Sequence, residues 1–348
     1  MDSDWWPTKG TVSRQEYVGS ESCAKCHSDK LEMQKETPMA HALSGPVSIL
    51  SRDLSKGPLE FRVGKYDYRI ANSKTGVNYS VSDGNQTDSV PLKWVFGIGQ
   101  FGRTYVFERN GSLFESRVSY YSAPRTLDFT TGSPRFPPSR IENALGRRMS
   151  PNELPLCFGC HSTGSTTENH FDQTSLTPGV TCEACHGPGA QHVAEMNVSH
   201  EEPAASSILN PARLPPVDSV DFCGACHRTS VDVALSGVTG MLTLRFPAYR
   251  LQKSRCWQAT KDVKLTCIAC HDAHGHLVRD ASYYDRQCLA CHSRNNIKPS
   301  HSAANKTCPV GQRACSSCHM PKFNIPDMHT SFTDHKIAIH REGAQFSE

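Results

Sequence analysis

One five-residue pattern, Cys-x-x-Cys-His, occurs seven times in the 348 residues of this chain. It uses fourteen of the sixteen cysteines, and a histidine directly follows the second cysteine in every copy. Paired cysteines with a neighbouring histidine are typical of three kinds of site: a zinc site, a thioredoxin-like redox pair and a covalently attached haem. Each would organise a different fold, so the choice among them constrains the architecture more than any other feature.

The repeated histidine favours haem. In c-type attachment, two thiols form thioethers with the vinyl groups of the porphyrin, and the histidine that follows binds the iron from one face. Zinc ribbons and redox pairs do not need a histidine at this position in every copy. We therefore expect seven covalently bound haem c groups, each with its iron. The attaching cysteines are Cys23, Cys26, Cys157, Cys160, Cys182, Cys185, Cys223, Cys226, Cys267, Cys270, Cys288, Cys291, Cys315 and Cys318, and the proximal iron ligands are His27, His161, His186, His227, His271, His292 and His319.

Composition agrees with haem groups that supply part of the core. Only 37% of the residues are hydrophobic and the mean hydropathy is −0.49, which is low for a chain of this length. The segments between the last six motifs are rich in Gly, Pro, Asp and Ser, so only brief helices are expected there. The predicted fold class is a multihaem cytochrome c, with short helices and irregular loops around stacked haems and an antiparallel β-rich insert.

Charge and compartment narrow the function further. The polypeptide carries a formal charge of +3, but two propionates and one ferric charge per haem bring the total to roughly −4, so nucleic-acid binding is not expected. Haem is attached to c-type cytochromes outside the energy-conserving membrane, which predicts a periplasmic or extracellular protein. The first residues lack the apolar stretch of an export signal, and we interpret the chain as one whose signal has been removed. No apolar stretch is long enough to predict a membrane span.

The stretch between the first two motifs has a different pattern. The segments KYDYRI, VNYSVSDG and RTYVFERNGSLFESRVSYY alternate with a period of two, which predicts an antiparallel meander or small sandwich over residues 55–130. Asn110-Gly111 predicts a type I′ hairpin turn. Gly97–Gly102 matches the dinucleotide-binding pattern G-x-G-x-x-G, but strands follow where a helix is needed, so we expect a turn. The predicted segments are an N-terminal single-haem segment (1–46), a β-rich insert with a Pro-rich linker (47–145) and a six-haem domain (146–348).

Each proximal histidine leaves one face of its iron open, and the group on that face decides between electron carriage and chemistry. Positions relative to the motifs favour distal ligation by His41, His192, His274, His301, His329 and His335. Weaker candidates are His170, His276 and His340, while His200 is expected on the surface. The two remaining cysteines are Cys256 and Cys308, for which an oxidising compartment favours a disulfide, with two separate buried thiols as the alternative.

Several stretches carry a family resemblance. YVGSESCAKCH followed by MAHAL, then CFGCHSTG, GVTCEACHGPGAQH and CSSCHMPK with FTDH, resemble the multihaem cytochromes related to the tetrahaem electron acceptor of hydroxylamine oxidoreductase (cytochrome c554-like). The resemblance covers residues 17–45 and about 145–340. It implies that His192 is a distal ligand to another haem and that the haems at Cys157 and Cys182 form a stacked couple. The chain departs from the pentahaem nitrite reductases, a more distant group, because it has no Cys-x-x-Cys-Lys motif.

Two classes of function fit these features. The leading hypothesis is a heptahaem electron-transfer protein without catalytic residues, whose partners are other redox proteins such as cytochromes or membrane quinol-oxidising complexes. The alternative is a reductase or oxidase of a small nitrogen or sulfur compound, because the convincing distal histidines are fewer than the irons. A variant of the first hypothesis is self-assembly, in which His340 ligates a haem of the next subunit and builds a conducting filament.

Overall fold

The computed structural model describes residues 14–98, 102–198, 207–258, 265–292, 308, 311–341, 343 and 345–348. Within these residues the chain forms two compact units. Unit 1 holds the described residues up to 198 together with Pro326–Thr330, and unit 2 holds those from 207 to Ile325 and Ser331–Glu348. Unit 1 therefore carries the first three Cys-x-x-Cys-His motifs and unit 2 the last four. This grouping differs from the three predicted segments, whose division remains a prediction.

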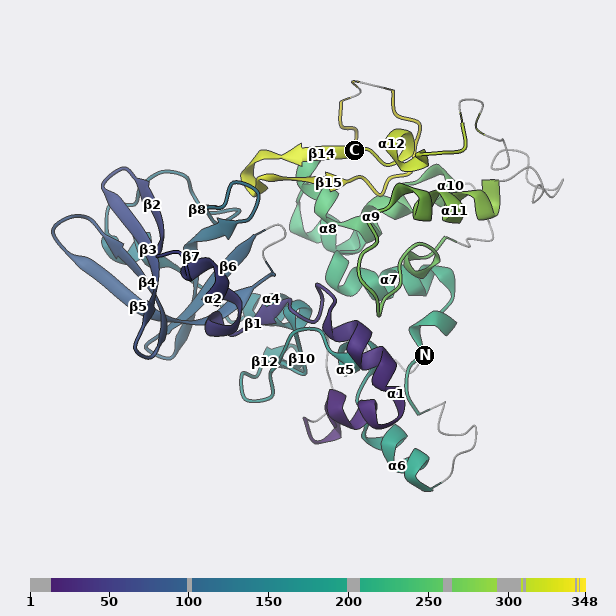
Figure 1. Ribbon diagram of the computed structural model, residues 1–348, viewed down its shortest axis with the longest axis horizontal. Coiled ribbons are helices and arrows are strands. Elements are labelled where there is room, and N and C mark those ends of the chain that lie inside the picture. Colours follow the sequence, from purple (N-terminus) through teal and green to yellow (C-terminus); the bar gives the residue numbers. More distant parts are fainter. Residues whose placement is uncertain are drawn as a thin grey trace. The chain divides into compact units, whose positions relative to one another are not determined.

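Unit 1 contains the predicted antiparallel insert. Its strands pair in chain order as a meander (Figure 1): β2 (Leu59–Val63), β3 (Tyr66–Ser73), β4 (Gly76–Ser82), β5 (Thr87–Phe96), β6 (Arg103–Arg109), β7 (Ser112–Tyr121) and β8 (Thr126–Phe129). Two short strands extend it, because β1 (Leu43–Ser44) pairs with β5 and β9 (Gly146–Arg148) pairs with β7. The rings of Phe61 on β2 and Phe129 on β8 lie 5.7 Å apart, so the sheet curls until its first and last strands approach each other.

The turns of the insert follow from its sequence. Asn110 and Gly111 have φ angles of 51° and 70° and form a two-residue loop between Arg109 and Ser112, which confirms the type I′ turn. Residues 97–102 connect the antiparallel strands β5 and β6, but residues 99–101 lie outside the described part, so the expected turn stays a prediction. Gly97 has a φ of 83°, and a Cβ there would lie 2.7 Å from the carbonyl oxygen of Gly102.

The insert has a hydrophobic core of its own. Along β3, Tyr66, Tyr68 and Ile70 alternate with exposed residues and are almost fully buried, and each such side chain contributes about 1.5–3 kcal/mol of burial free energy. The short helices α2 (Pro46–Leu54) and α3 (Ile141–Leu145) add Leu50, Leu54 and Leu145 to the same cluster. The insert therefore folds around apolar side chains of its own.

The motif-bearing segments consist of short helices and irregular chain, as predicted. In unit 1 these are the helices α1 (Ser20–Lys35), α4 (Glu153–His161), α5 (Cys182–His186) and α6 (Ala190–Val198), with two small ladders formed by β10 (Ser162–Thr163) and β13 (Thr177–Pro178) and by β11 (Thr166–Thr167) and β12 (His170–Phe171). In unit 2 they are α7 (Pro216–His227), α8 (Ser230–Ser236), α9 (Pro247–Gln252), α10 (Arg255–Gln258), α11 (Ala281–His292) and α12 (Cys315–His319), followed by the hairpin of β14 (Lys322–Ile325) and β15 (Thr330–Thr333).

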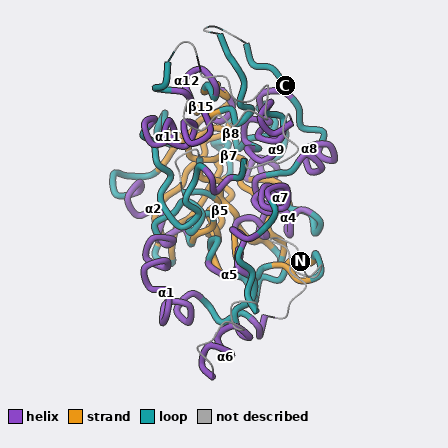
Figure 2. The backbone as a smooth tube through the Cα atoms, turned by 90° about the vertical axis from the view of Figure 1, so that its right-hand side faces the viewer, coloured by secondary structure: helices purple, strands orange, loops and turns teal. Residues whose placement is uncertain are grey.

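Short 3₁₀ turns complete the described chain at Arg14–Glu16, Pro211–Arg213, Gly240–Arg245, Cys267–Ala269 and Pro326–Met328. Figure 2 shows how brief the helices are and how much loop connects them. Among the described residues, no helix is both long and apolar enough to cross a bilayer.

Candidate haem-binding sites

Six of the seven Cys-x-x-Cys-His motifs lie within helices, although His27 in the first has non-helical angles, and the fifth begins on a 3₁₀ turn that ends before Cys270. Residues three and four apart share one face of a helix, so a helical turn presents both thiols and the histidine ring to the same side. The six motifs lie within α1 and at the ends of α4, α5, α7, α11 and α12. In the described chain no three His, Cys, Asp or Glu side chains converge as the ligands of a bare metal ion do. The helical geometry of the six motifs is compatible with attachment to one face of a porphyrin.

Two proximal histidines are held in the tautomer that iron binding needs. The Nδ1 atom of His161 lies 2.9 Å from the carbonyl oxygen of Ala42, and that of His319 lies 2.9 Å from the carbonyl oxygen of Ala338. An Nδ1–H that donates to a carbonyl leaves the lone pair on Nε2 for a metal, and such outer partners fix the orientation of the ring. These contacts are an observation in favour of haem at the second and seventh motifs.

The structure brings motifs together in pairs. The first cysteines of two motifs share a thiol–thiol hydrogen bond in three cases: Cys23 with Cys182, Cys223 with Cys267, and Cys288 with Cys315. Each pair lies within one unit. The family resemblance implied a couple between the motifs at Cys157 and Cys182, whereas the thiol that hydrogen-bonds to Cys182 in the structure belongs to Cys23. The stacking of the haems themselves remains a prediction.

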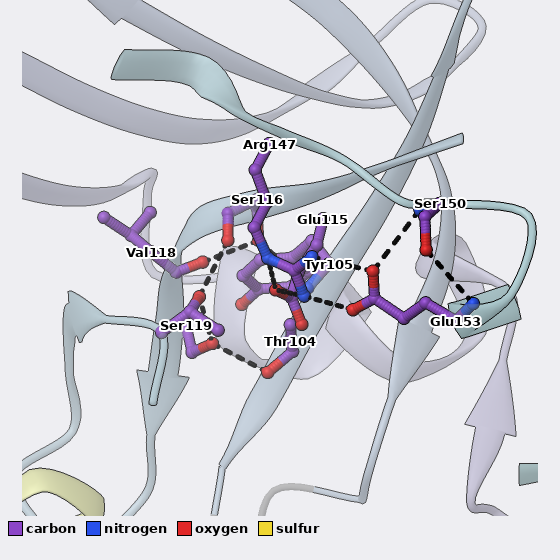
Figure 3. Close-up of polar contacts among 10 residues, drawn as sticks. Thr104, Tyr105, Glu115, Ser116, Val118, Ser119, Arg147, Ser150 and Glu153 are labelled. Carbon is purple, nitrogen blue, oxygen red and sulfur yellow. Dashed lines mark hydrogen bonds and ion pairs between the residues drawn. The ribbon is translucent and has the colours of Figure 1, made fainter. Parts of the chain in front are cut away.

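The β insert holds the helix that carries the second motif. The Arg147 guanidinium on β9 donates to two carboxylates, with Nε 2.8 Å from Glu115 Oε2 on β7 and Nη1 2.8 Å from Glu153 Oε2 in the first turn of α4 (Figure 3). Glu153 is one helical turn before Cys157. Burial raises the pKa of Glu115, although Arg147 acts in the opposite direction. This network ties the start of the helix to the sheet.

Aromatic packing adds to this attachment. The ring of Phe96, the last residue of β5, lies 4.8 Å from the imidazole of His161 and 5.0 Å from the ring of Phe158. Cys157 packs against the same hydrophobic cluster as Trp94, whose buried indole nitrogen has no hydrogen-bond partner. Beside them, a bulge in the β6–β7 pairing is closed by the Ser116 hydroxyl, which accepts from the backbone N–H of Tyr105 (Figure 3). The insert therefore packs directly against the helix that carries the second motif.

Three of the predicted distal ligands in unit 1 have different environments. His41 is exposed between α1 and β1, and His192 is partly buried on α6, just after the turn at Gly187 that ends α5. His329 has a φ of 51°, and its Nε2 lies 2.7 Å from the Asp128 carboxylate, with the ring of Tyr121 at 4.7 Å. Because the Nε2 of His329 is engaged by a carboxylate, its Nδ1 is the nitrogen left for a metal.

In unit 2, His335 faces a proximal ligand. Its ring centroid lies 6.3 Å from that of His271, the histidine of the fifth motif. Its Nδ1 lies 3.1 Å from the carbonyl oxygen of Thr333, which leaves Nε2 for a metal. Burial, with the nearby rings of His271 and His227, lowers the pKa of His335 to about 4. His335 is therefore neutral at neutral pH, the state in which imidazole binds a metal.

The other histidines lie in different environments. His274 is partly buried and its backbone N–H donates to Asp272, while His170 and His276 are exposed. His340 was ranked low from the sequence, but its Nε2 is buried and has no hydrogen-bond partner among the residues that the structure describes, and its backbone N–H donates to the carbonyl of Cys318. No periodicity or motif signals that burial. The predicted ligand His301 and the predicted surface residue His200 lie outside the described residues.

The expected disulfide between Cys256 and Cys308 is wrong for this structure. Neither cysteine takes part in a disulfide. Cys256 is partly buried, and the thiols that raise its pKa, after burial itself, are Cys288 and Cys291 of the sixth motif. Cys308 is exposed. An oxidising compartment favours disulfides in general, but a disulfide requires two Cβ atoms about 3.5–4.5 Å apart. The positions of two cysteines in the sequence do not reveal that distance.

Unit 2 contains a buried ion pair that was not predicted from the sequence. Arg250 on α9 and Asp334, which precedes His335, are both fully buried, with Nε–Oδ1 and Nη2–Oδ2 distances of 2.8 and 2.6 Å. The Nη1 atom of Arg250 is buried and has no hydrogen-bond partner within the described part of the chain. Nothing in the sequence around either residue distinguishes this pair from charges on the surface.

Comparisons with known proteins agree with the chemistry of the motifs. The family described as cytochrome c554 and c-prime matches residues 138–187, which include the second and third motifs. The multiheme cytochrome MtrA of Shewanella baltica (strain OS185) is 25% identical over 207 residues, which are 55% of this chain and 54% of that protein. The chain thus matches about half the length of this curated relative.

A solved structure shares the fold. The crystal structure of the outer cell wall cytochrome OcwA matches with a TM-score of 0.51 and 15% sequence identity, over 92% of this chain and 79% of that one. The family match and the relative MtrA, taken with the seven Cys-x-x-Cys-His motifs, support a relationship to the multihaem c-type cytochromes.

Proposed function

We propose that this chain binds seven haem c groups and carries electrons along them in periplasmic or extracellular respiration. The observation that carries the proposal is the repeated Cys-x-x-Cys-His motif, which lies within a helix in six of its seven copies. When bound, haem supplies a one-electron redox centre. The thiols fix the porphyrin edges, and the carbonyls of Ala42 and Ala338 hold two of the imidazoles in the metal-binding tautomer.

The pairing of motifs supports transfer between neighbours. Three thiol contacts place the attachment points of two motifs side by side, within unit 1 for Cys23 and Cys182 and within unit 2 for the other two pairs. Attachment points in contact hold the edges of two bound porphyrins close together, which is what electron transfer along a chain of haems requires. The protein's part is to set these separations and to tune potentials through axial ligands, burial and nearby charge.

Partners and compartment follow from the comparisons and the charge. One relative is named a multiheme cytochrome and the solved structure is named an outer cell wall cytochrome, which supports a location outside the energy-conserving membrane. The haem propionates give the loaded protein a net negative charge, which favours docking to redox proteins with a basic surface. We therefore infer that other cytochromes or a membrane quinol-oxidising complex exchange electrons with it.

One observation favours the alternative of a reductase or oxidase. The Nε2 of His329 bonds to Asp128, so one of the predicted distal ligands has its usual iron-binding nitrogen engaged. An iron without a sixth ligand can bind a small substrate. The filament variant has less support, because the Nε2 of His340 is buried within its own chain and a haem of another subunit would have to reach it there.

A count of haems and a spectrum test the proposal together. The intact mass of the exported protein and a pyridine haemochrome assay should both give seven haems per chain. Low-temperature EPR of the oxidised protein and CO titration of the reduced protein should then show only low-spin haems that do not bind CO. Fewer than seven haems would overturn the heptahaem assignment. A high-spin signal that shifts with nitrite or hydroxylamine would replace the carrier with the enzyme.

A further inference from the structure

Stability alone does not explain why Arg250 and Asp334 form a buried ion pair. Both side chains have 0% exposure, and removing two charges from water costs several kcal/mol per ion before their attraction repays it. Replacing such a pair by apolar residues of similar volume is often neutral or stabilising. The guanidinium is nonetheless fixed by three groups, because Nη2 also donates to the carbonyl of Ser347 at 3.0 Å and the ring of Phe346 lies 4.7 Å from the guanidinium carbon.

Asp334 and its neighbours immobilise the chain on both sides of His335. The backbone N–H of Asp334 donates to the carbonyl of Pro321 at 2.9 Å, and the Asp334 carboxylate accepts from the backbone N–H of Lys336 at 2.8 Å. The Ser254 hydroxyl also bonds to this stretch. It donates to the carbonyl of His335 at 3.1 Å and accepts from the backbone N–H of Ile337 at 2.8 Å. The position of the His335 backbone is therefore set by the ion pair and by Ser254.

The distance from His335 to His271 is that of two ligands of one metal. A metal–imidazole bond is about 2 Å long, so two rings on opposite sides of one metal have facing nitrogens about 4 Å apart and centroids about 6 Å apart. The observed separation of the centroids is 6.3 Å. His271 immediately follows Cys270, so its iron is the one attached at the fifth motif. The carbonyl of Thr333 occupies Nδ1 of His335 and leaves Nε2 for that iron.

We infer that His335 is the distal ligand of the haem attached through Cys267 and Cys270, and that the buried pair of Arg250 and Asp334 is the positioning device that holds His335 on that iron. The inference rests on the proposed haem attachment at the fifth motif. The ion pair, whose burial costs desolvation free energy, would then serve to fix the ligand geometry around one iron. His335 acts directly on the iron, whereas Arg250 and Asp334 act through the backbone of His335.

The ligand is tested in the purified, fully loaded protein. The variant His335→Ala should keep all its haems by mass and haemochrome assay, yet convert one haem to high spin in EPR, and the reduced protein should bind one equivalent of CO per chain. Added imidazole should restore the low-spin spectrum. If the His335→Ala protein stays entirely low-spin and does not bind CO, the assignment of His335 as a ligand is wrong.

A variant without the fifth attachment motif identifies the haem to which His335 binds. In Cys267→Ser/Cys270→Ser, one haem should be missing, and adding His335→Ala should then produce no high-spin signal. If the double cysteine variant keeps every haem, attachment at the fifth motif fails, and with it the proposed function at that site. If the haem is lost but His335→Ala still opens an iron, the attachment stands and the pairing of His335 with the fifth motif is wrong.

The positioning role is tested by replacing both charges at once. Arg250→Met/Asp334→Leu avoids leaving one buried charge unpaired, which on its own can prevent folding. We expect this variant to keep all its haems, with a mixed spin state at one haem and CO binding by a fraction of the protein. The reduction potential of that haem should rise, because the bond from His335 weakens. The matched control is Arg103→Met/Asp53→Leu, a mostly buried ion pair between β6 and α2 in unit 1, which should leave every haem low-spin. Spectra and potentials of the Arg250/Asp334 variant identical to those of the control would overturn the positioning role.

Discussion

Gly179 is the position where a single methyl group should cost most. It lies three residues before Cys182 and has a φ of 79°, and a Cβ built on it would overlap the carbonyl oxygen of Ala40 and lie 2.8 Å from the carbonyl carbon. Around this contact, the N–H of Val180 donates to the carbonyl of Met39 at 2.9 Å, and the side chain of Gln34 donates to the carbonyl of Val180. Gly179 therefore lets the segment that leads into the third motif pass directly against the loop that carries His41.

The expected cost of Gly179→Ala has two parts. A left-handed conformation costs an L-residue about 1–2 kcal/mol, and forcing an extra methyl group into a packed site costs about 1–3 kcal/mol more. We therefore expect a loss of about 2–5 kcal/mol of the free energy of unfolding of unit 1. The matched control is Gly132→Ala in the same unit, because Gly132 has a φ of 87° and a Cβ at that position would meet nothing within 4 Å. It should lose only the conformational part.

Urea unfolding of the haem-loaded variants, followed by far-ultraviolet circular dichroism, measures the difference between the two. Hydrogen exchange read by mass spectrometry locates it, since the amide of Val180 should exchange faster in Gly179→Ala but not in Gly132→Ala. Equal losses in the two variants would mean that the close approach of Ala40 costs nothing and would refute the steric part of the reasoning. An unchanged stability in both would refute the conformational part as well.

Three further predictions concern the insert and the second motif. Because burial raises the pKa of Glu115, the folded chain holds this proton more tightly than the unfolded chain. The stability that the neutral carboxyl contributes is therefore present at low pH and is lost as the pH rises through the folded pKa. In urea titrations, Glu115→Gln should gain stability relative to the parent between pH 4 and pH 7, and a difference independent of pH would contradict this. Arg147→Met breaks two ion pairs and leaves Glu115 unpaired, which should cost about 1–2 kcal/mol and speed hydrogen exchange in α4 but not in α5. Asn110→Val places a β-branched residue at a φ of 51° and should cost about 1–2 kcal/mol, whereas Asn110→Gly should be close to neutral; equal stabilities would show that the turn relaxes.

Short-range features of this protein were predictable because they depend on neighbours in the chain. Two cysteines and a histidine at positions i, i+3 and i+4 share one face of a helix, and six of the seven motifs lie within helices, whereas the 3₁₀ turn at the fifth ends before Cys270. Local sequence also predicted the hairpin at Asn110, where the turn type demands positive φ angles, and β3, where alternation of tyrosines with polar residues assigns one face to the core. Low apolar content outside the insert also signalled short helices.

Tertiary structure decided everything that depends on residues far apart in sequence. Cys23 meets Cys182, and Asp128 meets His329 about two hundred residues later, because the fold brings their segments together, and nothing in the local pattern reports that distance. The disulfide prediction failed for this reason. His335 was a candidate ligand from its sequence, but its apposition to His271 and the burial of the charged pair beside it depend on how several short segments of unit 2 pack. Local chain geometry determines how each motif offers its ligands, and long-range packing determines which partner those ligands meet.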